Sequence, residues 1–212
     1  MNTEVIKSDH PVVLHHAVDV LKNGGLVAFP TDTVYGLAAL PSNDEFIGRL
    51  YTVKGRENTR AIAILLSSPA ELGEVSIKPS KTALELANRF WPGPLTLIVP
   101  RHPDLPDILS PNPTIGVRVP NHVLALELLR LTGPLCVTSA NISGRENSNT
   151  AQEVLHQLDG KIHLVIDGGK SPGSIPSTVV DCTTPNPVIL RSGPINLEDI
   201  HEVITHKPPK LV

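Results

Sequence analysis

Twenty-one prolines divide this 212-residue chain into short segments, and this feature constrains the fold more than any other. Proline lacks a backbone N–H and is poorly tolerated inside a helix, so a helical bundle is excluded. Between the prolines, short apolar runs typical of buried strands alternate with stretches whose apolar residues recur at helical spacing. The pattern therefore predicts a protein of many turns and extended edges.

Strands and helices alternate through the first part of the chain, and strands then gather toward its C-terminal end. This order predicts an α/β fold, an open, twisted, mixed β-sheet flanked by helices, in a single domain over residues 1–212 with its core at about 11–206. The predicted strands lie within 25–31, 61–67, 94–100, 114–120, 135–137, 163–167, 177–182 and 188–192. The predicted helices span 11–22, 42–53, 81–90, 121–131 and 150–158, and a last one begins at Asn196. Capping boxes at Ser42 with Glu45 and at Thr150 with Glu153 mark two of the helix starts.

Composition limits where such a chain acts and what it binds. The formal net charge of -3 argues against a protein whose whole surface binds nucleic acid. No apolar run approaches 18 residues and the N-terminus lacks a signal-peptide core, so a cytoplasmic protein without membrane contact is expected. We interpret the two cysteines, Cys136 and Cys182, as buried free thiols.

Polar residues follow or interrupt several of the predicted strands without a structural reason of their own. The run "PLCVTSANISG", residues 134–144, turns from a strand into hydroxyls and an amide at Ser139 and Asn141. The stretch "FPTDTVYGL" places Thr33 and Tyr35 after a strand, and "VKGRENTR" places cations on a loop after a helix. Arg118 lies within "TIGVRVP", where alternation puts it on the face opposite its valine neighbours, and Arg191 ends "VILRSG".

Each of these segments also has an ordinary structural interpretation. The stretch "FPTDTVYGL" can be a turn capped by side chains, and the basic loop can be a set of partners for a helix dipole. The two strand arginines can be exposed edge charges. Ligands of open α/β sheets bind at strand ends, however, and all the segments reach such ends. If they share one end of the sheet, they form an anion site suited to a nucleoside triphosphate. Its cations would be Lys54, Arg56, Arg60, Arg118 and Arg191.

Taken together, these segments resemble the threonylcarbamoyl-adenylate synthase family, the YrdC-like proteins. The matching pieces, which span residues 24–195, are "FPTDTVYGL", the K-x-R of Lys54 and Arg56, "WPGPLTLIV", "TIGVRVPNH", the S-x-N of Ser139 and Asn141, "STVVD" and "RSGP". The resemblance implies a YrdC-like fold and an enzyme that converts L-threonine, bicarbonate or carbon dioxide, and ATP into threonylcarbamoyl-AMP and pyrophosphate. It implies Mg²⁺ accompanying ATP, no metal site of the protein, and a separate tRNA-modifying transferase that takes the product.

The resemblance also implies roles for individual residues. The catalytic positions would be Lys54, Arg56, Ser139 and Asn141. The ATP contacts would be Lys54, Arg56, Arg60, Thr114, Asn141, Asn149 and Arg191. The threonine contacts would be Thr33, Tyr35, Arg118, Ser139 and Ser177, with Arg118 pairing the substrate carboxylate.

Some positions depart from the family pattern and leave alternatives open. Glu57 and Ala61 replace prolines that often follow the K-x-R motif, while Arg60 replaces a lysine and keeps its charge. Leu65 stands where some relatives have histidine, and Asn149 replaces a small hydroxyl residue. One alternative is therefore a paralogue with a different amino-acid substrate. Another is a double-stranded RNA or tRNA-binding module, since a concave basic surface also accepts a phosphate backbone.

Overall fold

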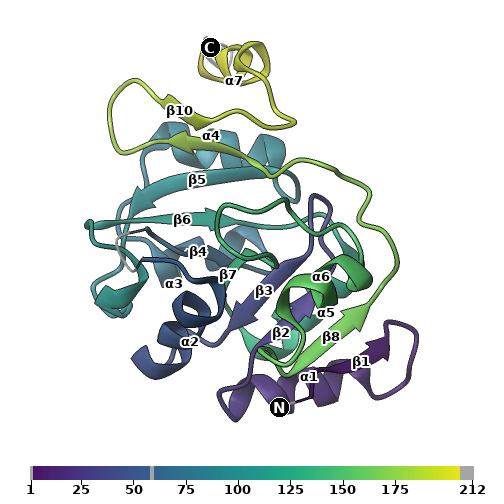
Figure 1. Cartoon of the computed structure of the whole chain (residues 1–212). Helices are drawn as coiled ribbons and strands as arrows, with labels where there is room; N and C mark the ends of the chain where they lie inside the picture. Colours follow the sequence, from purple (N-terminus) through teal and green to yellow (C-terminus); the bar gives the residue numbers. More distant parts are fainter. Residues whose placement is uncertain (1, 58–59, 206–212) are drawn as a thin grey trace.

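The structure is a computed structural model that describes residues 2–57 and 60–205, which build one ten-stranded mixed sheet with helices on both faces (Figure 1). The strand order is β1-β8-β2-β3-β7-β4-β6-β5-β9-β10. The strands are β1 (Glu4–Lys7), β2 (Val27–Phe29), β3 (Gly36–Ala39), β4 (Ala63–Leu65), β5 (Leu95–Pro100), β6 (Thr114–Arg118), β7 (Leu135–Ser139), β8 (Leu164–Asp167), β9 (Thr178–Asp181) and β10 (Val188–Arg191). The helices are α1 (Val13–Lys22), α2 (Asp44–Lys54), α3 (Leu72–Val75), α4 (Lys81–Phe90), α5 (Val123–Thr132), α6 (Ala151–Leu158) and α7 (Leu197–Thr205), with short 3-10 turns at Pro69–Glu71 and Asp107–Leu109. The predicted fold class is confirmed.

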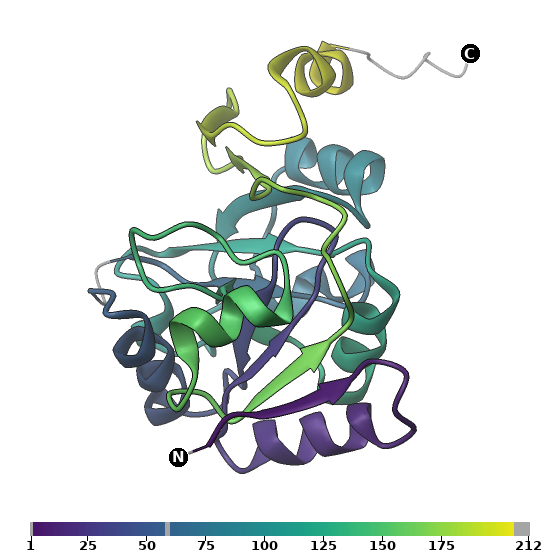
Figure 2. The same ribbon diagram turned by 45° about the vertical axis from the view of Figure 1, so that its right-hand side comes forward.

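Two hydrophobic cores lie on opposite faces of this sheet. On one face, α1 and α5 contact each other and pack over β2, β8 and part of β7, as Figure 2 shows for the purple and teal helices at its base. On the other face, α2, α4 and α6 cover a larger core that includes side chains of β5 and β6. The strands belong to both cores because alternate residues of a strand point to opposite faces.

The helix layer formed by α1 and α5 leaves part of its sheet face uncovered. On that face, β7 contributes Leu135 and Val137 to the core, and β4 contributes Leu65. Farther across the same face, over β4, β6, β5 and β9, a cavity opens whose floor combines small, polar and apolar residues. The fold therefore places the candidate site on a face of the sheet.

Most predicted elements are confirmed. All eight predicted strands and six predicted helices are present, and the helix over Lys81–Phe90 has the bounds that we predicted. Side chains of Thr150 and Asn196 cap their helices as expected, at distances of 3.2 and 2.8 Å from the Glu153 and Asp199 nitrogens. The cap at Ser42 is wrong, because Asn43 makes it by accepting a hydrogen bond of 2.7 Å from the Glu45 N–H. Strands β1 and β3 were not predicted, because neither forms a long apolar run.

The single domain over residues 1–212 and its core at about 11–206 stay predictions. Strand β1 lies before residue 11, so the sheet begins earlier than expected, and residue 206 lies outside the described residues. Cys136 and Cys182 are both buried and free, as predicted. Among residues 2–57 and 60–205, no helix has the length and apolar character needed to cross a membrane.

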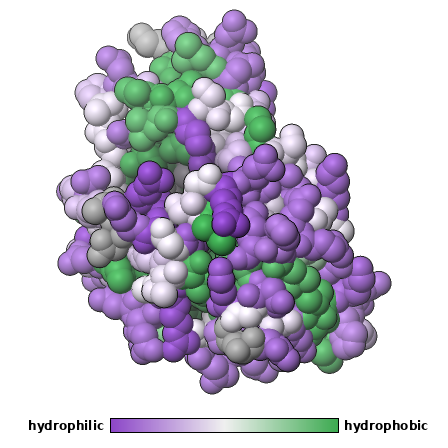
Figure 3. Space-filling model, in the orientation of Figure 1, coloured by the Kyte–Doolittle hydropathy of each residue, from purple (hydrophilic) through white to green (hydrophobic). Residues whose placement is uncertain are grey.

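The C-terminal end of the described chain projects from the sheet. Strand β10 is the last strand in the sheet order and pairs with β9, and α7 follows it beside α4 (Figure 1). Val188, Leu190 and Leu197 in this region are exposed, and Figure 3 shows hydrophobic side chains gathered over β10 and α7 on a face that is otherwise largely hydrophilic.

Candidate active site

A cavity of about 270 Å³ lies on the uncovered part of the sheet face. Its floor is formed by alternate residues of neighbouring strands: Gly36, Val137, Ser139, Ala63, Leu65, Gly116, Arg118, Thr96, Ile98 and Val179. The predicted residues do stand at strand ends, since Arg118, Ser139 and Arg191 are the last residues of β6, β7 and β10, but the cavity between them extends over the sheet face. The pleat explains this floor, because Gly116 and Arg118 of β6 line the cavity while Ile115 and Val117 are buried in the opposite core.

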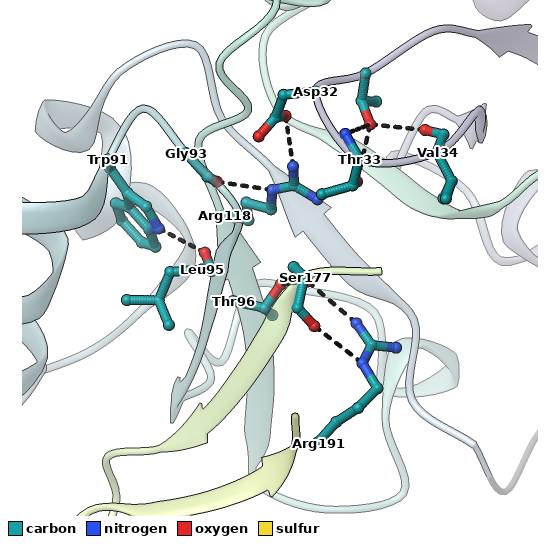
Figure 4. A network of polar contacts seen from close by, with 11 residues as sticks. Asp32, Thr33, Val34, Trp91, Gly93, Leu95, Thr96, Arg118, Ser177 and Arg191 are labelled. Atoms are coloured by element: carbon teal, nitrogen blue, oxygen red, sulfur yellow. Dashed lines mark hydrogen bonds and ion pairs between the residues drawn. The ribbon is translucent and has the colours of Figure 1, made fainter. Parts of the chain in front are cut away.

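Arg118 lies at one end of the cavity and is almost completely buried, with 6% of its surface exposed. Its Nε donates to the Gly93 carbonyl at 2.9 Å, and its Nη1 donates to Thr33 Oγ1 at 3.0 Å (Figure 4). Its Nη2 forms an ion pair of 2.5 Å with Asp32. Burial lowers the pKa of Arg118 and the Asp32 carboxylate opposes that change, so the ion pair keeps a buried guanidinium charged.

Arg191 lies across from Arg118, with the hydroxyls of Thr96 and Ser177 between the two arginines. Its Nε donates to the Ser177 carbonyl at 3.0 Å and its Nη2 donates to Ser177 Oγ at 3.1 Å. Ser177 Oγ in turn lies 2.7 Å from Thr96 Oγ1. Figure 4 shows Thr96 and Ser177 between the guanidinium groups of Arg118 and Arg191.

Arg56 reaches the cavity from the loop after α2. Helix α2 ends at Gly55, whose φ of 57° is in the left-handed region that glycine adopts at low cost, and this turn directs the chain toward β7. Arg56 donates to Thr138 Oγ1 at 3.2 Å and to the Ala61 carbonyl at 2.7 Å. Its Nε is buried and has no acceptor in the described part of the chain.

The electrostatic character of the cavity is that of an anion site. Three guanidinium groups line it, those of Arg56, Arg118 and Arg191, and no carboxylate is among the described residues that line it. Burial lowers the pKa of Arg191, and the nearby charge of Arg56 lowers it further. Among the described residues, Arg118 alone of the three has a carboxylate partner, so a bound anion can balance the other two positive charges.

Lys54 and Asn141 lie behind the cavity and shape its wall. Lys54 Nζ donates to the carbonyls of Ser139 at 2.5 Å and Asn141 at 2.6 Å, and it lies 3.3 Å from Asn141 Oδ1. Asn141 Nδ2 donates to the Ile142 and Arg145 carbonyls, and Asn141 Oδ1 accepts from Ser139 Oγ. Burial lowers the pKa of Lys54 to about 7, with a smaller contribution from Arg56. The lysine and the amide thus hold the turn that follows β7.

Tyr35 joins two loops around the cavity. Its N–H donates to the Ser148 carbonyl at 2.8 Å, and its carbonyl accepts from the Ala140 N–H at 2.8 Å. Its hydroxyl donates to the Gly169 carbonyl at 2.7 Å and accepts from the Gly168 N–H at 3.2 Å. Burial raises the pKa of this hydroxyl to about 12, so it stays protonated. These contacts explain the burial of Tyr35 as an anchor for the loops that follow β7 and β8.

The residues predicted from the sequence divide into two groups. Those that line the cavity are Thr33, Tyr35, Arg56, Arg118, Ser139, Ser177 and Arg191. Those that do not line it are Lys54, Asn141, Arg60, Thr114 and Asn149. Of this second group, Lys54 and Asn141 contact Ser139, whereas Arg60 is exposed on its loop. The roles assigned to all these residues stay predictions.

The residues that sequence reasoning did not assign to this site include Asp32, Thr96, Thr138 and Asn147. Asp32 was noticed only as part of a polar turn, and its pairing with Arg118 joins residues 86 positions apart. Thr96 had a usable signal, because it is the one hydroxyl inside the apolar run "PLTLIVP". Among the described residues, no group of three or more His, Cys, Asp or Glu side chains could hold a metal ion.

Comparison with known proteins identifies relatives over nearly the whole chain. Residues 19–193 match the family model Sua5/YciO/YrdC, described as "Telomere recombination". A protein of Bacillus subtilis (strain 168) named threonylcarbamoyl-AMP synthase is 37% identical over 205 residues, which make up 95% of this chain and 59% of that protein.

Two solved structures share the fold. The crystal structure of P. abyssi Sua5 complexed with L-threonine matches with a TM-score of 0.91 and 36% identity, over 97% of this chain and 61% of that one. The crystal structure of E. coli YciO matches with a TM-score of 0.83 and 26% identity, over 94% of this chain and 100% of that one. The chain thus spans about three fifths of the length of the Bacillus and Pyrococcus relatives.

Proposed function

Because this chain belongs to the Sua5/YciO/YrdC family, we propose that it catalyses the formation of threonylcarbamoyl-AMP and pyrophosphate from L-threonine, bicarbonate or carbon dioxide, and ATP. The enzyme is an L-threonylcarbamoyladenylate synthase, a nucleotidyltransferase whose product serves a separate transferase that modifies tRNA. The names of the similar proteins and the threonine complex of the P. abyssi relative support this proposal.

One observation carries the proposal, namely a cavity that three guanidinium groups line and that, among the described residues, no carboxylate lines. A site with this charge suits a ligand with several negative groups. We assign the amino acid to the end with Arg118, Thr33 and Ser177, where a guanidinium meets a carboxylate in a bidentate way. Tyr35 supports this end through the loops that it anchors.

The nucleotide occupies the other end of the cavity in this proposal. Arg56 and Arg191 hold phosphate oxygens, and Ser139 lies between the two ligands. Lys54 and Asn141 act by holding the turn that carries Ser139, a role that differs from direct contact with the triphosphate. Arg60, Thr114 and Asn149 are assigned to the outer parts of ATP. ATP enters as its Mg²⁺ complex, with the metal bound to the phosphates.

The chemistry proposed for this site needs no protein nucleophile. The threonine amine loses a proton and adds to carbon dioxide, and a carbamate oxygen then attacks the α-phosphorus as pyrophosphate departs. Nucleotidyl transfer of this kind depends on positioning and on charge stabilisation of the phosphate oxygens. Arg56 and Arg191 supply that charge from side chains held by protein acceptors, so little reorganisation is needed. We place the reaction in the cytoplasm, where its substrates are found.

Release of pyrophosphate tests this proposal. With the purified protein, release should require L-threonine, bicarbonate and MgATP together. Replacement of Arg56 by alanine should lower the rate about a hundredfold, since loss of one transition-state charge costs roughly 3 kcal/mol. The control is Arg89→Ala, which removes an exposed arginine of α4 outside the cavity and should leave the rate unchanged.

Two outcomes would contradict the proposal. Pyrophosphate release that ignores threonine would remove the amino acid from the reaction. No release, together with salt-sensitive binding of tRNA, would favour the RNA-binding alternative. An effect of Arg56→Ala below threefold would show that the reaction takes place away from this cavity.

A further inference from the structure

Thr96 is a buried polar residue that lines the cavity, and the proposed reaction assigns no role to it. It lies in β5 with 7% of its surface exposed, between Leu95 and Leu97, which are fully buried in the opposite core. Its side chain therefore points to the cavity face, which it helps to line. A hydroxyl at such a position needs hydrogen-bond partners, because an unpaired buried polar group is destabilising.

The sheet register places Thr96 beside Arg118. Leu97 of β5 pairs with Val117 of β6 in an antiparallel register, so the residue before Leu97 faces the residue after Val117. Side chains opposite each other in antiparallel strands have Cβ atoms about 5 Å apart. A ligand group held by Arg118 therefore lies within reach of the Thr96 hydroxyl.

Thr96 and Ser177 have two hydroxyl hydrogens between them, and among the described residues only one of these is used in a hydrogen bond. Ser177 Oγ accepts a hydrogen bond from Arg191, and the contact of 2.7 Å between Ser177 and Thr96 uses one of their two hydroxyl hydrogens. The other hydroxyl hydrogen has no acceptor among the described residues. Either hydroxyl can be the donor in this contact. Because the guanidinium polarises Ser177 Oγ and makes it the better donor, we assign Ser177 as the donor to Thr96. The free hydrogen is then that of Thr96.

We propose that Thr96 is a substrate-binding residue whose hydroxyl donates a hydrogen bond to the carboxylate of the amino acid held by Arg118. This inference rests on the proposed function. The chain of contacts from Arg191 through Ser177 to Thr96 orients the hydroxyl toward that carboxylate. Thr96 thereby contributes to selection for an amino acid, and its contribution is to binding, since the carboxylate does not change during the reaction.

Calorimetric titration of L-threonine into wild-type protein and variants at this position tests the inference. Thr96→Val keeps the shape of the side chain and removes the donor, and it should weaken binding about tenfold or more, as expected for a hydrogen bond to a charged group. Thr96→Ser keeps the donor and should bind within about threefold of wild type. In pyrophosphate release, Thr96→Val should raise the KM for threonine and leave kcat nearly unchanged.

Matched controls separate this role from a structural one. Thr132→Val removes a hydroxyl that donates to the Leu128 carbonyl at the end of α5, away from the cavity, and should leave threonine binding unchanged. Equal threonine affinity in Thr96→Val and wild type would overturn this inference and leave the proposed function unaffected. Weak binding in both Thr96→Val and Thr96→Ser would also overturn it, because packing would then explain the loss. If wild-type protein binds no threonine, the proposed function and this inference fail together.

Discussion

Arg118 carries a positive charge that is almost wholly removed from water, and its surroundings explain how the fold tolerates that charge. The side chain of Arg118 is 7% exposed and that of its partner Asp32 is 10% exposed. Isolated charges in such surroundings are strongly destabilising, whereas a paired and hydrogen-bonded guanidinium is tolerated. Asp32 therefore keeps a cation ready at the amino-acid end of the cavity before any ligand arrives.

Removal of the Asp32 charge should cost much more stability than removal of an exposed carboxylate. Asp32→Asn leaves a buried guanidinium without its counter-ion, and the free energy of unfolding should fall by about 3 kcal/mol. Asp107→Asn is the control, since its carboxylate pairs with Arg101 but is 95% exposed, and that variant should unfold as wild type does. Urea denaturation of the three proteins measures both effects. Similar losses in the two variants would mean that the Asp32 pair is no different from a surface ion pair.

At the scale of elements, the turn after β7 depends on one side chain from another element. Lys54, the last residue of α2, donates to the carbonyls of Ser139 and Asn141, and its own carbonyl accepts from the Ser143 N–H at 2.9 Å. Helix α2 and the S-x-N turn are thereby joined on the side of the turn away from the cavity. The K-x-R and S-x-N motifs are thus two halves of one structural unit, with Arg56 and Ser139 facing the cavity.

This arrangement predicts a pH dependence of stability that Lys54 causes. The pKa of Lys54 is lowered from 10.5 to about 7 in the folded protein, mainly by burial. Between these values the unfolded chain binds more protons, so the contribution of Lys54 to stability increases as pH rises through this window. The difference in unfolding free energy between wild type and Lys54→Met should therefore shift in favour of wild type by roughly 1 kcal/mol or more between about pH 7.5 and 9. Urea denaturation at several pH values measures it, and a difference that stays constant would show that Lys54 titrates normally.

Across the whole molecule, periodicity predicted more of the fold than of the site. The alternation in β6 correctly put Arg118 on the face opposite Val117 and Val119. The short strand β3 had no comparable signal, because "GLAA" is small and apolar on both faces. Without β3 and the strand order, the sequence could not show that β5, β6 and β7 present one continuous face.

The site itself depends on contacts between residues far apart in the chain, which a single sequence does not encode in a readable way. Motif resemblance identified the cavity arginines, but the residues that contact those arginines became known only from the structure. Asp32 pairs with Arg118 across 86 positions, and Thr96 meets Ser177 across 81. The same limit explains why Lys54 was expected inside the cavity, since a lysine in a basic loop gives no sign that its ammonium turns toward backbone carbonyls.

The central claim is that one cavity on the sheet face holds both the amino acid and the nucleotide. A crystal structure of the protein with L-threonine and a non-hydrolysable ATP analogue tests it most directly. The account predicts the threonine carboxylate beside Arg118 and Thr96, with phosphate oxygens between Arg56 and Arg191. Threonine or phosphates bound outside this cavity, with the three arginines contacting only protein, would contradict it.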